Sequence, residues 1–377
     1  MNTIPKAKSH RNPALDLLRI TAFFFVVCVH FYVNSGYREL VTEGRAMFIM
    51  NIAYALFNTC VALFVMLTGY LMTNKTLSLG YYKGVIHTLV IYVAASAVCL
   101  LYKIIYYDYS KNILKCIMKI LDFTASGYSW YVEMYLGLFL LIPFLNAAYH
   151  GMKSRGGKTA LVLTLIVTTA LPGVINSFRF GSAEWWLTPS SSGAYNQLIP
   201  DWWTGIYPIT YFFLGSYLRE YPLKMKKRYL FPLTVVTVIL IGAYNFYRLR
   251  GDKFFFGAFI TNASLLVLIP AVLIFSFFQK LDLTRLARPV KFILSKISLW
   301  TFGAYVVSDV VDAYTYVRLR ERIPEIADRF KWAPVTVFFV ALCALAISGV
   351  LNTMYDIIVK GVSALSSFFP KKLRKKL

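Results

Sequence analysis

The sequence predicts an all-α membrane protein: a polytopic bundle of about ten transmembrane helices with both termini in the cytoplasm. Of its 377 residues, 58% are hydrophobic and only 15% are charged, whereas soluble domains are about half apolar and about a quarter charged. The mean hydropathy is +0.59. Apolar segments recur along the whole chain, and lipid offers no partners for backbone polar groups, so each spanning segment must be helical.

The apolar segments are spaced by short polar stretches, and each can cross a hydrocarbon core of roughly 30 Å. They lie at 16–34, 48–72, 85–106, 130–149, 159–177, 204–219, 229–248, 256–278, 292–312 and 333–357. Basic residues precede the first segment, as in a signal peptide, but no small-residue cleavage site follows it, so we expect a retained helix. The chain then divides into a cytoplasmic arm (1–14), a membrane domain (15–358) and a basic cytoplasmic tail (359–377).

The net charge of +23 is distributed unevenly between alternate loops. Loops on the side of the N-terminus are rich in Lys and Arg and poor in Asp and Glu, whereas loops on the other side contain most of the acidic residues. The positive-inside rule therefore places both termini in the cytoplasm. The cluster at 371–377 can also bind anionic lipid headgroups, although topology explains it equally well. Nothing in this pattern indicates a nucleic-acid partner.

Two stretches on the other side of the membrane have distinctive patterns. In 108–122, Lys111, Lys115 and Lys119 share one helical stripe opposite apolar residues, which predicts an amphipathic helix lying in the membrane interface. The loop 177–203 contains two tryptophan pairs, at 185–186 and 202–203. These rings suit the stacking of sugars, and an aromatic belt at headgroup level is the alternative interpretation.

Arg19 and His30 lie inside the first apolar segment, where ionisable groups cost several kcal/mol unless they face a protein interior or an aqueous cavity. They are eleven residues apart, or three helical turns plus about 20°, so both share one face, roughly 16 Å apart along the axis. Asp16, three residues before Arg19, can pair with it on the helix surface. A snorkelling arginine and a hydrogen-bonded histidine are the alternative to a functional pair.

The residues around this pair resemble the first helix of the acyltransferase-3 family, in which an arginine is followed by ten residues and a histidine. Four further blocks resemble the family in the same order, at 60–71, 128–131, 211–217 and 295–308. Ala62, Val65 and Thr68 depart from the second block. Ser308 stands where the family commonly has a second histidine, so any role of that histidine is in doubt here.

The resemblance implies an integral-membrane acyltransferase of about ten helices in a bacterial plasma membrane. Its expected reaction moves an acetyl group from cytoplasmic acetyl-CoA to a hydroxyl of an extracytoplasmic cell-surface polysaccharide or its lipid-linked oligosaccharide precursor. Another donor, such as succinyl-CoA, remains open. A flippase or exporter of lipid-linked oligosaccharide, or a polysaccharide polymerase, would also need buried charge and long outer loops.

Several residues are candidates for this reaction. Arg19 suits the diphosphate of CoA, Asp16 would orient Arg19, and His30 would act as general base or carry the acyl group. Glu133 could orient His30 or an acceptor hydroxyl. Basic residues expected near the 3′-phosphate of CoA are Lys226, Lys227 and Arg228, and aromatic candidates for substrate contact are Tyr70, Trp185, Trp186 and Tyr305.

Other residue types argue for less specific roles. Asp309 and Asp312, near the outer end of the ninth segment, are interpreted mainly as packing or solvated pairing, although one could serve catalysis. The five cysteines are scattered without metal-ligand spacing, so the sequence predicts neither a disulfide scaffold nor a metal site.

Overall fold

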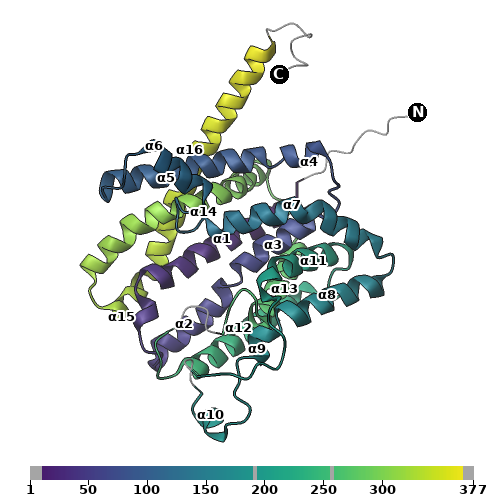
Figure 1. Ribbon diagram of the computed structural model, residues 1–377, viewed down its shortest axis with the longest axis vertical. Coiled ribbons are helices and arrows are strands. Elements are labelled where there is room, and N and C mark those ends of the chain that lie inside the picture. Colours follow the sequence, from purple (N-terminus) through teal and green to yellow (C-terminus); the bar gives the residue numbers. More distant parts are fainter. Residues whose placement is uncertain (1–10, 190–192, 255–258, 368–377) are drawn as a thin grey trace.

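A computed structural model describes residues 11–189, 193–254 and 259–367 (Figure 1). The described residues form helices and connecting segments, with no named strand among them; two isolated β-bridges join 41–42 to 250–253. The helices are α1 Pro13–Asn34, α2 Gly44–Phe57, α3 Cys60–Met72, α4 Leu79–Lys83, α5 Ile86–Tyr106, α6 Ile113–Leu121, α7 Trp130–Gly151, α8 Arg155–Thr169, α9 Pro172–Ile175, α10 Ala183–Leu187, α11 Tyr207–Glu220, α12 Lys227–Leu249, α13 Leu265–Gln279, α14 Arg288–Arg322, α15 Ile326–Arg329 and α16 Ala333–Ser367, with 3₁₀ turns η1 Tyr37–Glu39, η2 Thr204–Ile206 and η3 Phe330–Trp332.

The predicted fold class is confirmed: this is an all-α polytopic membrane protein. Within the described residues, eight helical stretches are long and apolar enough to cross a bilayer. The predicted segments 204–219 and 256–278 correspond to the shorter helices α11, with 14 residues, and α13, with 15. α14 has 35 residues and extends well beyond the predicted segment 292–312. The expected N-terminal arm (1–14) lies partly outside the described residues, and the tail cluster 371–377 lies wholly outside them.

The helix α1 lies at the centre of the bundle. It starts where Asn12 accepts a hydrogen bond from the amide of Ala14, with Pro13 in the first turn, and both features favour a helix N-terminus. α1 packs against α2, α3, α13, α14 and α16, and a larger share of it is buried than of any other long helix described. The charged and titratable side chains of α1 are therefore enclosed by protein.

Two glycines let α3 and α11 approach closely. A Cβ atom at Gly69 would lie 1.9 Å from the carbonyl oxygen of Phe212, and one at Gly215 would lie 1.9 Å from that of Met66. Small residues permit such contacts between membrane helices, where van der Waals packing drives association. The second and fourth blocks that resemble the family therefore meet each other across this interface.

The predicted segment 48–72 is broken into α2 and α3 at Asn58 and Thr59. The side-chain amide of Asn58 donates to the carbonyl oxygen of Ile260, and the hydroxyl of Thr59 donates to that of Leu56. Both polar side chains thus satisfy backbone groups near the break, as irregular backbone at membrane depth requires. The break also brings residues from both helices to the cavity described below.

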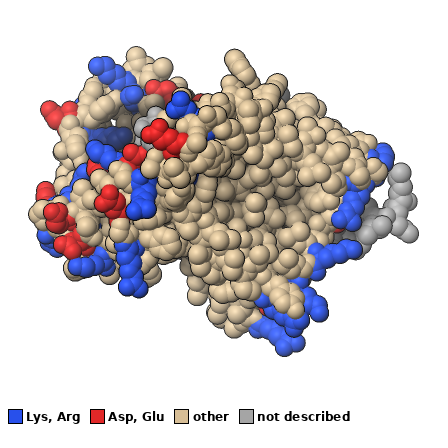
Figure 2. All heavy atoms as spheres, turned by 90° about the horizontal axis from the view of Figure 1, so that it is seen from below, with Lys and Arg blue, Asp and Glu red and all other residues tan. Residues whose placement is uncertain are grey.

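The predicted amphipathic stretch 108–122 contains α6, and no residue of this helix is buried. Its apolar side chains are exposed, including Ile113 and Leu114 at 78% and 66%. Figure 2 shows basic side chains at both ends of the molecule, most of the visible acidic ones at one end, and a wide uncharged surface between. This surface matches the part of a membrane protein that faces lipid.

Candidate active site

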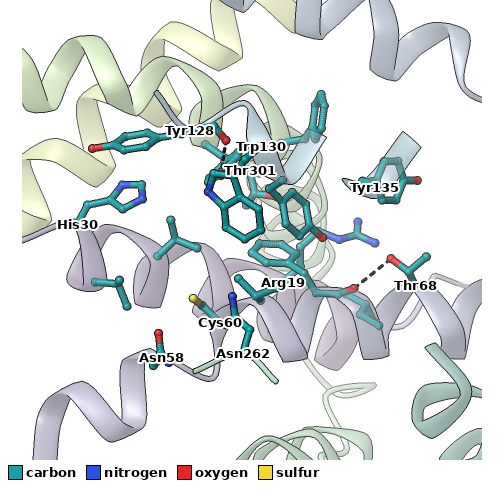
Figure 3. Close-up of a pocket in the computed structure, with 18 of the residues that line it drawn as sticks. Arg19, His30, Asn58, Cys60, Thr68, Tyr128, Trp130, Tyr135, Asn262 and Thr301 are labelled. Atoms are coloured by element: carbon teal, nitrogen blue, oxygen red, sulfur yellow. Dashed lines mark hydrogen bonds between the residues drawn. The ribbon is translucent and has the colours of Figure 1, made fainter. Parts of the chain in front are cut away.

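One cavity of about 690 Å³ contains both Arg19 and His30 in its lining. Its walls come from α1, α2, α3, α5, α7 and α14, together with 127–128 and 260–262. Figure 3 shows the two side chains on opposite sides of this space, with His30 beside Tyr128 and Arg19 toward Thr68 and Tyr135. Cavities of this size accommodate substantial parts of a ligand. The arginine and the histidine that share a helix face therefore share a cavity as well.

His30 lies against a carboxylate from α14. Its Nδ1 atom is 3.4 Å from Oδ2 of Asp312, and both side chains are buried. This contact does not meet the geometry of a hydrogen bond, so Nδ1 has no such partner here, but catalytic hydrogen bonds often tighten only when substrate binds. A carboxylate on this side fixes the imidazole tautomer and stabilises an imidazolium. Nε2 is then the nitrogen that remains for chemistry in the cavity.

Tyr128 and Asn34 hold this pair in place. The ring of Tyr128 stacks on the imidazole, with centroids 3.7 Å apart and an interplanar angle of 24°. Its hydroxyl donates to Oδ2 of Asp312 at 2.6 Å, and the amide of Asn34 donates to the same oxygen at 3.2 Å. The hydroxyl of Tyr305 donates to the carbonyl oxygen of Tyr128. The imidazole is therefore fixed by stacking on one face and by charge at Nδ1.

The other side of the cavity surrounds a partly buried arginine. Nη1 of Arg19 donates to the hydroxyl of Ser298 on α14 at 3.3 Å. Tyr135 and Thr68 line the same side (Figure 3), and His87 of α5 is a further lining residue of the cavity. A guanidinium that faces a cavity retains donors for a ligand. Arg19 thus suits a bound anion better than a purely structural role.

The lining contains basic residues and no acidic ones. The basic residues are Arg19, Arg38, His30 and His87. No Asp or Glu occurs among the described residues that line the cavity. Asp312 lies behind His30 and is not a lining residue. Such a lining favours anionic ligands.

Asp16 and Glu133 occupy positions different from those their expected roles require. Asp16 is 4% exposed and accepts hydrogen bonds from Nε and Nη2 of Arg11, at 2.8–3.0 Å. The expected partner Arg19 instead contacts Ser298. Arg11, five residues before Asp16, reaches the carboxylate from the segment that precedes the helix. Glu133 is exposed on α7 and does not line the cavity, so the carboxylate beside His30 comes from Asp312.

The remaining candidates are dispersed. Among the expected aromatic residues only Tyr305 lines the cavity. Trp185 is buried, and the guanidinium of Arg248 lies 4.4 Å from its ring centroid. Trp186 stacks on Phe178 at 5.5 Å, and Tyr70 packs on Phe275 at 5.6 Å. Lys226, Lys227 and Arg228 are exposed where α12 begins and do not line the cavity.

The comparison with family models identifies the family of this chain. Residues 12–352 match the model of the acyltransferase-3 domain, described as an acyltransferase domain. The chain belongs to the acyltransferase-3 family. It is therefore a multi-pass membrane acyltransferase. No curated protein and no solved structure gives a significant match to this chain.

In this acyltransferase, Ser308 stands where the family commonly has a second histidine. Ser308 is fully buried and donates to the carbonyl oxygen of Tyr305, so its hydroxyl is satisfied within α14. One helical turn later, Asp312 lies beside His30, while Asp309 accepts a hydrogen bond from the amide of Gly127. The two acids of α14 thus have separate partners. Sequence reasoning underrated Asp312, although its position one turn after the block 295–308 was a usable signal.

Proposed function

We propose that this acyltransferase moves an acetyl group from cytoplasmic acetyl-CoA to a hydroxyl of an extracytoplasmic cell-surface glycan or its lipid-linked precursor, in the bacterial plasma membrane. The observation that carries the proposal is that Arg19 and His30 line one cavity inside the bundle. The pantetheine arm of CoA is about as long as their axial separation of roughly 16 Å. With the phosphates at Arg19, the thioester would reach His30.

The basic loops support the orientation of this transfer. The loops on the side of the N-terminus contain the excess of Lys and Arg, so the Arg19 end of α1 would face the cytoplasm, where acyl-CoA is made. The His30 end would then lie toward the outer face, where the acceptor is located. Lys226, Lys227 and Arg228 belong to the same basic side as Arg19 and remain candidates for the 3′-phosphate.

The site supports two routes for the acyl group. In the first, Nε2 of His30 takes the proton of the acceptor hydroxyl while the hydroxyl oxygen attacks the thioester carbonyl carbon. The carbon–sulfur bond breaks, and the imidazolium returns the proton to the thiolate. In the second, Nε2 attacks the carbonyl carbon, the carbon–sulfur bond breaks and CoA leaves as its thiolate, which gives an acyl-imidazolium. The acceptor oxygen then attacks the acyl carbon, the bond to Nε2 breaks to restore neutral imidazole, and the hydroxyl proton passes to the thiolate. Asp312 would stabilise the cationic imidazole in both.

The test combines acetyl-CoA binding with glycan acetylation. We expect His30→Ala to abolish acetylation but retain acetyl-CoA binding, and Arg19→Ala to weaken both, while each protein accumulates in the membrane. Arg45→Ala is the control, because Arg45 is exposed and does not line the cavity. Near-normal acetylation by either cavity variant would defeat the assignment. Wild-type protein that binds no acetyl-CoA would favour an exporter instead.

A mass measurement separates the two routes. Purified protein is incubated with acetyl-CoA in the absence of acceptor and analysed intact. An added acetyl mass that is present in the wild type and absent from His30→Ala supports the covalent route, and an unmodified protein that still acetylates glycan supports general-base catalysis.

A further inference from the structure

Arg38 is the second arginine in the cavity lining, and the proposed reaction assigns it no role. It belongs to η1, which packs against α1 just after the helix ends at Asn34. His30 lies one turn before this end, whereas Arg19 lies near the beginning. Arg38 is thus placed beyond His30, on the acceptor side of the proposed transfer.

The backbone around Arg38 is held on both sides. Gly36 has φ +86° and turns the chain after α1, in a conformation that glycine adopts without steric cost. Tyr37 is 1% exposed, packs against Phe31 and donates its hydroxyl to the carbonyl oxygen of Ala327. On the other side, the carbonyl oxygen of Leu40 accepts from the amide of Phe254 at 2.7 Å. Arg38 therefore extends from a fixed turn.

A neighbouring arginine, Arg329, holds this turn in place. The guanidinium of Arg329 donates to the carbonyl oxygens of Ser35, Ile323 and Pro324 at 2.6–2.7 Å, and the residue is 6% exposed. These hydrogen bonds anchor the turn to the segment between α14 and α15. Arg329 therefore fixes the turn from which Arg38 extends, and the side chain of Arg38 lines the cavity.

The electrostatics of the cavity then restrict the acceptor. No Asp or Glu lines it in the described part of the chain, and Arg38 adds a permanent positive charge to the side opposite Arg19. In a partly desolvated space, attraction between a guanidinium and an anion is stronger than in water. The planar guanidinium fork also matches carboxylate and phosphate geometry. A neutral acceptor can accept hydrogen bonds from this guanidinium but gains less from its charge than an anion does.

We propose that the acceptor carries an anionic group close to the hydroxyl that is acylated, and that Arg38 binds this group. The proposal rests on the acyltransferase function above and adds a substrate class to it. The anion has two possible sources: the carboxylate of an acidic sugar, or the diphosphate of a lipid-linked precursor. Arg38 would be a specificity-determining residue, because it contacts the acceptor and not the transferred acyl group.

The first experiment identifies the acylated residue in cells. Surface glycans and lipid-linked precursors from a deletion strain are compared by mass analysis with those from the complemented strain. We expect the glycan that loses an acyl mass to contain a carboxylate or phosphate on the acylated sugar or its neighbour. If the anion is the lipid diphosphate, acylated lipid-linked precursor should be found before polymerisation.

The second experiment uses purified protein with that acceptor and with the same acceptor after its carboxyl is reduced or its phosphate removed. For the anionic acceptor, we expect Arg38→Gln to lower kcat/KM about tenfold to one-hundredfold, mainly through KM, and Arg38→Lys to lower it less. For the neutralised acceptor, wild type and Arg38→Gln should differ much less. Acetyl-CoA binding should not change in either variant, and Arg45→Gln should match wild type with both acceptors.

The outcomes separate this inference from the function on which it rests. If no glycan loses an acyl group on deletion, the acyltransferase proposal fails. If an acyl group is lost from a neutral sugar with neutral neighbours, and neutral and anionic acceptors respond equally to Arg38→Gln, the anionic-acceptor proposal is overturned while the acyltransferase stands.

Discussion

The two ring nitrogens of His30 have different surroundings, and this difference defines the chemistry of the site. Nδ1 is near Oδ2 of Asp312, whereas the ring itself lines the cavity and stacks on Tyr128. An imidazole held in this way presents its second nitrogen in one orientation, which a freely rotating side chain does not. Stacking on Tyr128 adds to this, because the same tyrosine hydroxyl donates to Asp312.

Removal of the charge from Asp312 tests this arrangement. We expect Asp312→Asn to lower kcat one-hundredfold or more, since proton transfer by a positioned base contributes about 10²- to 10⁴-fold. Acetyl-CoA binding should be unchanged. Asp309→Asn is the matched control, because Asp309 accepts from the amide of Gly127 and not from His30. Equal losses in the two variants would show that Asp312 contributes only to folding.

The role of Arg19 is tested by the shape of its replacement. Arg19→Lys keeps a charge but loses the planar fork, so we expect a KM for acetyl-CoA at least about tenfold higher with kcat changed much less. Arg11→Lys is the control, because Arg11 binds Asp16 and does not line the cavity. This variant should keep the KM for acetyl-CoA near the wild-type value. Steady-state kinetics with acetyl-CoA varied at saturating acceptor measure both. An unchanged KM in Arg19→Lys contradicts binding of CoA phosphates by Arg19.

At the residue scale, the sequence could predict the relative positions of side chains on one helix. Arg19 and His30 share a face because of the helical period, and they share a cavity in the structure. The partner of His30 depends instead on how α14 packs against α1, which no local pattern gives. The hydrogen-bond partner of Asp16 likewise comes from outside the helix, because Arg11, in the segment before α1, offers two nitrogens to its carboxylate.

Helix packing explains the glycines in two blocks of the family pattern. Gly69 and Gly215 belong to different blocks, and each lies against the backbone of the other helix. α3 begins at Cys60, which lines the cavity, so this tight contact helps to fix one wall. This helix contact therefore helps to shape the site.

Substitution of these glycines should destabilise the fold. In Gly69→Ala or Gly215→Ala the new methyl group would overlap a backbone carbonyl oxygen at 1.9 Å, which forces the helices apart. We expect a loss of about 1–3 kcal/mol, typical of overpacking, seen as a lower melting temperature in detergent. Gly137→Ala on α7 is the control, because nothing lies within 4 Å of the position that its methyl group would take. A melting temperature equal to that of this control would refute the packing argument.

Element boundaries show where sequence patterns reach their limit. Hydropathy predicted the helical segments, because each must bury its backbone polar groups whatever its neighbours are. It predicted 48–72 as one span, and Gly44–Met72 is a single candidate span in the structure. It did not indicate the break in the helix at Asn58, whose amide donates to the carbonyl oxygen of Ile260. That partner comes from a distant segment, so only the tertiary structure reveals why the break is stable and why it opens onto the cavity.

The distribution of charge over the whole molecule is the basis for the direction of transfer. Basic and acidic side chains gather at the ends of the molecule, with a wide uncharged surface between them (Figure 2). α1 runs between the ends, so Arg19 and His30 lie at different depths. If the basic loops face the cytoplasm, an acyl group that moves from the Arg19 side to His30 moves outward. Orientation thus decides whether donor and acceptor enter from opposite sides.

Accessibility labelling tests this orientation directly. Lys111→Cys, ahead of α6, and Lys226→Cys, where α12 begins, replace exposed residues on opposite predicted sides. In a Cys116→Ser background, which removes the cysteine of α6, we expect a membrane-impermeant maleimide to label Lys111→Cys in intact cells. Lys226→Cys should be labelled only after permeabilisation, because the positive-inside rule places its loop in the cytoplasm. The background protein without either new cysteine measures labelling of the remaining thiols, of which Cys28, Cys60 and Cys99 are buried. The reverse pattern would place Arg19 toward the outer face, away from cytoplasmic acyl-CoA, and would contradict the proposed direction of transfer.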